Sequence, residues 1–406
     1  MKRSEETKKV IILFLVGFGF SAIFSWVLTR QESILIRSDH FSRWYATRML
    51  VIQQRSIYDP GNGREVVSLN PIPVDPIEGS FFYPATLLVF TLPLVSLPYP
   101  VAHFIWVTLI QLFVLIGIGL VYREVHWPGS ANQLAVLVLL SMFFIPNLQN
   151  TIWGQFNTIG FLSLALVYVV LQRERYWLAG MLAAGLTFKP QNMLLALLFL
   201  LLWASLRRKR WSLLGGFFLS CFGLWLFAEW WEPNWVVSFL QGVQAYAGYL
   251  HPRAIMDSLG VSAWIWGCLL LGIGGWMLLK SIDEPPQSAL FAGCLAISLA
   301  IWWLSVPVLG MMDLAALPLP LMLLLSSWKK IDFRIHKLGV YGAFGLYVLG
   351  VAGFIYGLST PSLYGVHILL SEVAYKAGFP ILLILLSLPL SSSRWRDRSN
   401  DLFLVV

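Results

Sequence analysis

The sequence has little charge: 12% of its 406 residues are Asp, Glu, Lys or Arg, whereas 58% are hydrophobic. A soluble core of this length does not need windows of about 20 residues with hardly a charge, but such windows recur from Val10 to Leu390. Alternating strands are also lacking, and a bilayer admits only helices or closed barrels. We therefore predict an all-α polytopic membrane protein.

Cysteines and metal-ligand patterns are scarce. The three cysteines, Cys221, Cys268 and Cys294, lie inside apolar runs, where inert packing is the simplest interpretation. Histidines and acidic residues do not cluster at metal-ligand spacing. We predict neither a cofactor nor a structural metal; a divalent ion on a substrate phosphate stays open, without support from the sequence.

Basic residues give the chain a formal net charge of +8, but they gather in short loops between apolar runs rather than on a nucleic-acid-binding surface. Such clusters mark cytoplasmic loops; they lie before Val10, at 207–210, at 329–330 and at 394–398. Both termini are therefore predicted to be cytoplasmic, in a bacterial inner (plasma) membrane. The first apolar run lacks a small-residue cleavage site and is expected to stay as an anchor.

Hydropathy predicts a single domain over 1–406 with about twelve transmembrane helices. The expected spans are 10–29, 100–122, 132–148, 156–172, 176–190, 191–206, 212–230, 258–280, 287–305, 308–327, 338–357 and 378–391. The segment from Tyr83 to Pro100 is short and carries four prolines, so we expect a re-entrant or broken helix there. The long loops 30–82, 231–257 and 358–378 then share the outer face, where function is expected.

The first outer loop carries a predicted amphipathic helix. Ser38 is a suitable N-cap, and apolar residues recur at helical spacing from Phe41 to Ile52, while Arg43 and Thr47 face elsewhere. Asp39 lies in the first turn, four residues before Arg43. The two could form an ordinary surface ion pair or part of a site.

Polar residues gather at the outer ends of later spans. Gln155 and Asn157 lie in "NTIWGQFNTIGF", and Lys189, Gln191 and Asn192 lie in "AAGLTFKPQN". A half-buried lysine needs an anion, although Lys189 could also extend to the interface.

Other polar residues allow two interpretations each. Asp313 is either a satisfied buried group or a substrate contact, and His251 and Arg253 either meet a phosphate or are simply solvated. Asp59 suits a turn. Glu229 and Glu232 flank two tryptophans that fit an interfacial belt better than a sugar-binding shelf.

Four motifs occur in order: "SDHFSRWY" with Asp39, "FFYPA" with Tyr83, "WGQFN" with Gln155, and "FKPQ" with Lys189. Together they resemble glycosyltransferase family 87, the polyprenol-phosphate-dependent mannosyltransferases of the GT-C superfamily. The likeness covers about 39–192, with a looser one at 306–320. This sequence departs from the pattern in having alanine after "YP" and no tyrosine before Asp313.

The resemblance implies a GT-C-type bundle that transfers a hexose from polyprenyl phosphate, with mannose as the leading candidate. The acceptor would be a hydroxyl of a glycolipid or glycan on the outer face, and the anomeric configuration would invert. Asp39 would be the general base. The substrate-binding set would be Lys189, Gln155, Asn157, Gln191, Arg43, His251, Arg253 and Asp313. A lipid-linked glycan ligase and a lipid-linked sugar transporter or flippase remain alternatives, as does an inactive relative.

Overall fold

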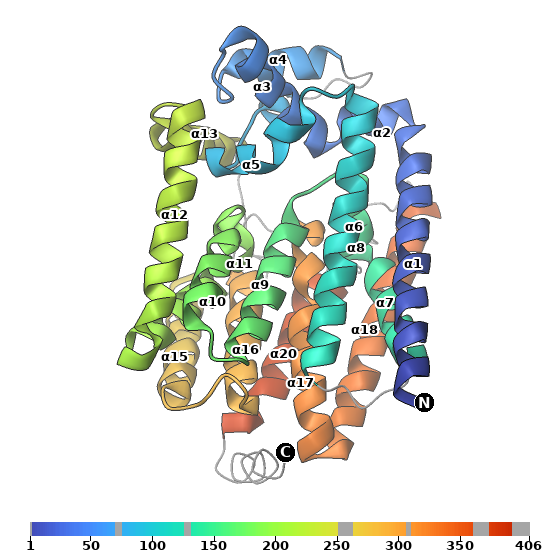
Figure 1. Ribbon diagram of the computed structural model, residues 1–406, viewed down its shortest axis with the longest axis vertical. Helices are drawn as coiled ribbons and strands as arrows, with labels where there is room; N and C mark the ends of the chain where they lie inside the picture. Colours follow the sequence, from blue (N-terminus) through green and yellow to red (C-terminus); the bar gives the residue numbers. More distant parts are fainter. Residues whose placement is uncertain are drawn as a thin grey trace.

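The computed structural model describes residues 2–69, 75–125, 131–250, 263–305, 310–359 and 373–391. All regular elements within these ranges are helices, which confirms the predicted fold class. Most of the longer helices run alongside one another, and the short helices of the first outer loop lie across one end of the bundle (Figure 1).

Five helical stretches are long and apolar enough to cross a membrane. They include α6 (Tyr99–Glu124), α12 (Trp211–Trp231), α17 (Pro318–Ile331), α18 (Phe333–Ser359) and α20 (Phe379–Ser387), some extended by adjoining short helices. A sixth arises if α7 (Ala131–Met142) and α8 (Ile145–Ile152), bent by 55° at their junction, count as one span.

The other apolar helices are shorter. They include α9 (Asn157–Leu171), α10 (Tyr176–Ala183) with η4 (Ala184–Thr187), α11 (Pro190–Ser205) and α16 (Ala289–Ser305). α15 (Ala263–Ser281) packs on α16, and α1 (Lys2–Thr29) packs on α6. Each of the twelve predicted spans overlaps a helix. By length and composition, however, only five or six of the described helical stretches are candidate crossings, so the count of twelve stays a prediction.

The burial of side chains shows that α16 lies at the centre of the bundle and α12 at its periphery. Nearly every residue of α16 is buried, including Trp303, whereas α12 buries only a few. α12 packs on α10 through glycines: a Cβ at Gly180 would lie 2.0 Å from the main-chain oxygen of Leu213. Small residues allow this close approach, as is common between membrane helices.

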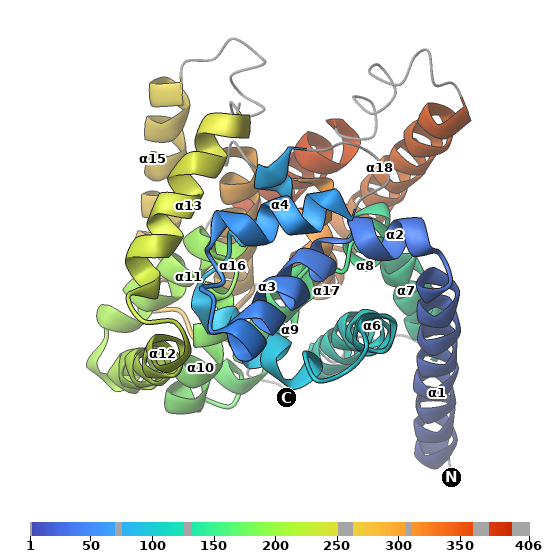
Figure 2. The same cartoon turned by 90° about the horizontal axis from the view of Figure 1, so that it is seen from above.

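The first outer loop forms α2 (Glu32–Arg37), α3 (Asp39–Gln53), α4 (Pro60–Ser68) and η1 (Pro76–Gly79) (Figure 2). The predicted start of α3 is confirmed, because the Ser38 side chain accepts a hydrogen bond from the Phe41 amide. The expectation that Arg43 and Thr47 face away from the core is wrong. Both are buried, and Thr47 donates to Thr91 at 2.9 Å.

The proline-rich segment after this loop is broken, as expected. It consists of η2 (Ala85–Leu87), α5 (Leu88–Thr91) and η3 (Leu92–Leu94), after which α6 begins. The indole of Trp44 donates to the main-chain oxygen of Leu94 at 3.1 Å, which holds α3 against this segment. The amphipathic helix therefore packs on protein and covers one end of the bundle (Figure 1).

Candidate active site

Asp39 lies in the first turn of α3 with about a third of its side chain exposed. One carboxylate oxygen, Oδ2, accepts a hydrogen bond from Nε2 of Gln155. The other, Oδ1, lies 3.4 Å from the guanidinium of Arg43. Arg43, one turn along the same helix, and Gln155, 116 residues away in the sequence, thus hold the carboxylate while leaving it accessible.

Gln155 connects this carboxylate to a second charged pair. Its Oε1 accepts hydrogen bonds from the Tyr83 hydroxyl at 2.8 Å and from Nζ of Lys189 at 3.0 Å. Lys189 also donates to Oδ1 of Asp313 at 2.6 Å. Because lysine can only donate, Gln155 must present its oxygen to Lys189 and its amide nitrogen to Asp39.

Lys189 and Asp313 form a buried ion pair whose side chains are 9% and 6% exposed. Lys189 precedes Pro190, which starts α11, and Asp313 lies in η6 (Met311–Ala316), where its Oδ2 accepts from the Gly310 amide at 2.7 Å. The buried charges compensate each other. Neither simple solvation nor extension of Lys189 to the interface describes this arrangement.

The backbone at Gly154 places Gln155. Gly154 has a φ of +61°, a conformation that favours glycine, and a Cβ there would lie 2.7 Å from Cβ of His40. Trp106 donates to the Gly154 main-chain oxygen at 2.8 Å. The turn between α8 and α9 therefore approaches α3 closely enough for Gln155 to reach Asp39.

His40 is fully buried behind Asp39. Burial, followed by the neighbouring His103 and Arg43, holds the pKa of His40 well below its usual value. Its ring stacks on Trp106, with centroids 5.6 Å apart. A neutral ring in this place fills the space between α3 and α6 without adding charge next to the carboxylate.

Asn157 supports the far side of the site. Its Nδ2 donates to the main-chain oxygen of Met312 at 2.8 Å, and its Oδ1 accepts from Asn192 at 2.6 Å. These bonds tie α9 and α11 to η6. Asn157 thus positions the segment that carries Asp313.

A cavity of about 280 Å³ opens beside Asp39. Its lining includes Arg37, Arg43 and Met312 together with residues of η1 and of α13 (Trp235–Leu250). Phe82 and Tyr246 stack there with centroids 4.5 Å apart. A polar, aromatic-lined cavity whose accessible carboxylates are those of Asp39 and Glu78 can bind a hydroxylated substrate next to a base.

The structure brings together Asp39, Arg43, Gln155, Lys189, Asp313 and, through Met312, Asn157. Gln191 is not part of this group; its main-chain oxygen accepts a hydrogen bond from the indole of Trp302 at 2.7 Å. The two expected phosphate ligands His251 and Arg253 lie outside the described residues. Sequence reasoning missed Arg37, Phe82 and Tyr246 as cavity residues, because nothing in their local pattern shows that the outer loops meet.

Metal ligation finds no support among the described residues, where histidines, cysteines and acidic residues do not gather in groups of three or more. The charged groups beside the cavity are instead arginines and carboxylates. At the end of α12, Trp230 lies between Glu229 and Glu232 and is 84% exposed, which fits a tryptophan of an interfacial belt.

The family model for glycosyltransferase family 87 matches residues 81–327, more than half of the chain. The match includes Tyr83, Gln155, Lys189 and Asp313, and it begins after Asp39. Neither the curated proteins nor the solved structures contain a significant match to the chain.

Proposed function

The chain belongs to glycosyltransferase family 87, a family of membrane glycosyltransferases. We propose that it transfers one hexose, with mannose as the leading candidate, from a polyprenyl-phosphate donor to a hydroxyl group of a glycolipid or glycan. The single observation that carries the proposal is the position of Asp39: an accessible carboxylate at the edge of a cavity, held by Gln155 and Arg43.

In the proposed reaction the acceptor oxygen attacks the anomeric carbon of the donor from the side opposite the phosphate. A new carbon–oxygen bond forms as the bond to the phosphate oxygen breaks, so the anomeric configuration inverts. The acceptor proton passes to Asp39, and the phosphate leaves with the bonding electron pair. A positioned general base contributes about 10²–10⁴-fold to such a step.

The leaving phosphate gains negative charge, which cations can stabilise. Arg43 and Arg37 both line the cavity, and Arg37 has no acidic partner among the described side chains. Lys189 is already paired with Asp313. We therefore assign it a smaller role in stabilising the phosphate charge and a larger role in orienting Gln155.

The proposed membrane arrangement follows from the basic loops. We infer about twelve crossings in a GT-C-type bundle, several of them made by short apolar helices, with both termini on the cytoplasmic side of a plasma membrane. The segment 83–100 would re-enter the membrane from the outer side. Asp39 would then face the outer surface, where a lipid-anchored donor presents its phosphate.

The test is transfer of radiolabelled mannose from polyprenyl phosphate by membranes that contain the wild type or Asp39→Asn at matched expression. We expect transfer to fall by about 10²–10⁴-fold, because asparagine keeps the shape but cannot accept the proton. Asp59→Asn is the control: Asp59 caps α4 by accepting from the Gly61 amide, and asparagine caps equally well.

Equal transfer by Asp39→Asn and the wild type would remove Asp39 from the mechanism. A wild type that moves a lipid-linked sugar across vesicles without forming a glycosidic bond would favour a flippase. Transfer of a preassembled glycan from a lipid diphosphate would favour a ligase.

A further inference from the structure

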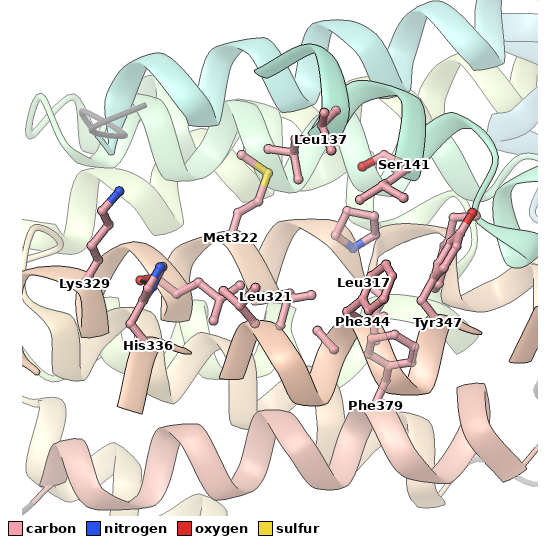
Figure 3. Close-up of a pocket in the computed structure, with 17 residues that line it drawn as sticks. Leu137, Ser141, Leu317, Leu321, Met322, Lys329, His336, Phe344, Tyr347 and Phe379 are labelled. Atoms are coloured by element: carbon pink, nitrogen blue, oxygen red, sulfur yellow. Dashed lines mark hydrogen bonds between the residues drawn. The ribbon is translucent and has the colours of Figure 1, made fainter. Parts of the chain in front are cut away.

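Two cavities among the described residues differ in the ligands that suit them. A cavity of about 490 Å³ is lined mainly by apolar side chains of α7, α17 and α18, with Lys329 and His336 at one end (Figure 3). The cavity beside Asp39 is lined largely by polar and aromatic side chains, and these include a second carboxylate, that of Glu78. A ligand rich in hydroxyl groups therefore suits the cavity beside Asp39.

Glu78 lies in η1, which is fixed against α4. The Asp75 side chain caps η1 by accepting a hydrogen bond from the Ile77 amide at 2.9 Å. A Cβ at Gly79 would lie 2.7 Å from the main-chain oxygen of Gly63 in α4, so the two backbones are in close contact. Glu78 therefore presents its carboxylate to the cavity from a fixed backbone.

The Glu78 carboxylate is half occupied. Its Oε1 accepts a hydrogen bond from the Tyr249 hydroxyl of α13 at 2.7 Å. Within the described ranges Glu78 forms no ion pair and its Oε2 accepts no hydrogen bond, and the side chain is exposed. Oε2 can therefore accept a hydrogen bond from a ligand in the cavity.

Phe82 and Tyr246 form an aromatic wall of the same cavity. A Cβ at Gly242, one turn before Tyr246 on α13, would lie 3.5 Å from the Phe82 ring, so Phe82 packs along this helix. The next residue, Tyr83, is buried and donates to Gln155, which holds the proposed base. The aromatic wall is thus adjacent in the chain to the group that positions the base.

A sugar ring matches this combination of groups. Its C–H groups form an apolar face that packs on aromatic rings, and its hydroxyl groups donate hydrogen bonds to a carboxylate. Asp39 and Glu78 both line the cavity, so a negatively charged acceptor group would meet like charges there. The ligand that suits this side of the cavity is therefore neutral.

We propose that Glu78 and the aromatic wall of Phe82 and Tyr246 bind a neutral sugar unit of the acceptor and select glycosides over simple alcohols. The proposal rests on the proposed function, in which Asp39 takes the acceptor proton, so the sugar beside Asp39 belongs to the acceptor. Small-molecule pockets measure about 300–1,000 Å³. At about 280 Å³ this cavity suits a single sugar unit.

The first experiment measures binding without transfer. The full-length protein in nanodiscs, without donor, is irradiated with mannosides, glucosides and galactosides that carry a diazirine on the aglycone, and the labelled residues are mapped. We expect labels at 78–82 and 246–249 from at least one glycoside. The methyl glycoside of the same sugar should displace this probe, whereas inorganic phosphate and glycerol at the same concentration should not.

A pair of charge variants separates recognition from general electrostatics. Glu78→Gln keeps an acceptor for Tyr249 but loses the charge, so it should raise the KM for the best-labelling glycoside about tenfold while kcat and the donor KM stay near wild type. Asp75→Asn is the matched control. It removes the same charge from the N-cap of the same short helix, asparagine also caps, and Asp75 does not line the cavity, so the acceptor KM should not change.

A pair of ring variants tests the aromatic wall. Tyr246→Ala should weaken labelling about tenfold, whereas Tyr246→Phe keeps the ring and should label like the wild type. Should Tyr246→Ala fail to fold, Glu78→Gln and the wild-type label map still decide.

Three results would overturn the proposal: no glycoside labels the cavity, Glu78→Gln leaves the acceptor KM unchanged, or Glu78→Gln raises the donor KM alone, which would assign the donor sugar to this place. Displaceable labelling of the cavity in a wild type that forms no glycosidic bond would instead overturn only the proposed function.

Discussion

The buried pair of Lys189 and Asp313 shows how one residue limits what its neighbours can do. An unpaired charge at such a depth is costly, so each member requires the other. Lys189 in turn fixes the Gln155 oxygen, and Gln155 fixes Asp39. Loss of Lys189 should therefore lower the stability of the fold and also disturb the position of Asp39, the proposed base.

A double-mutant cycle separates these effects. Lys189→Met alone should destabilise the protein by about 3–5 kcal/mol, because it leaves Asp313 charged and unpaired in the interior. Lys189→Met combined with Asp313→Leu should recover most of the thermal stability measured in detergent but not the transfer activity. Full activity in the stable double variant would show that the pair does not orient the site.

Gly154 is a second residue with a sharp expectation. Gly154→Ala should cost about 1–2 kcal/mol from the left-handed backbone alone, and more from the clash with His40. The expected result is a lower Tm together with reduced transfer. Gly345→Ala is the control: it lies in α18 with open space around it and should be neutral or slightly stabilising. Unchanged Tm and activity in Gly154→Ala would contradict the proposed constraint.

At the scale of elements, the outer loop is fastened to the bundle by a buried glutamate. Glu232, at the end of α12, accepts hydrogen bonds from the Ser56 hydroxyl at 2.6 Å and from the Ile57 amide at 2.9 Å. These contacts join segments about 175 residues apart and hold the connection between α3 and α4. The acid therefore has a structural role here.

Glu232→Ala should release this connection without touching the cavity residues. We expect faster hydrogen exchange at residues 55–58 and a several-fold lower transfer rate, because α3 and Asp39 lose one of their supports. Glu229→Ala is the matched control, since among the described residues Glu229 accepts a hydrogen bond from the nearby Asn234 amide and not from the outer loop. Equal protection of 55–58 in both variants would show that the loop is held by other contacts.

The helices and their caps follow from local sequence, and the contacts between them do not. Ser38 and the spacing after it predict α3, and the prolines predict the broken segment before α6. The bond between Gln155 and Asp39 joins residues 116 apart, and local pattern carries no information on such pairing. For the same reason Arg43 was expected to face outward, whereas tertiary packing buries it.

At the scale of the whole molecule, the membrane topology is the main prediction. Helices of fewer than about 18 residues are too short to count as straight crossings by length alone, so the described helices give five or six candidate spans and the twelve remain a prediction. The basic loops nevertheless give a definite orientation: the first outer loop and the connection after α11 should lie on opposite sides.

Cysteine labelling tests this orientation. In a variant without Cys221, Cys268 and Cys294, single cysteines replace two exposed serines, Ser68 at the end of α4 and Ser205 at the end of α11. A membrane-impermeant maleimide should label Ser68→Cys in intact spheroplasts and Ser205→Cys only after permeabilisation. Labelling of both in intact spheroplasts would refute the proposed topology.

The direction of a single amide group has a consequence for how the enzyme resets after each turnover. Gln155 cannot rotate to offer its oxygen to Asp39 without turning its NH₂ group toward the ammonium of Lys189. Gln155 therefore keeps Oδ2 as an acceptor, and we expect a captured proton on Oδ1, which lies 3.4 Å from Arg43 and is the less tightly held oxygen. If Arg43 also meets the phosphate, as we propose, departure of the phosphate would change the charge beside this proton, so product release would be coupled to restoration of the base.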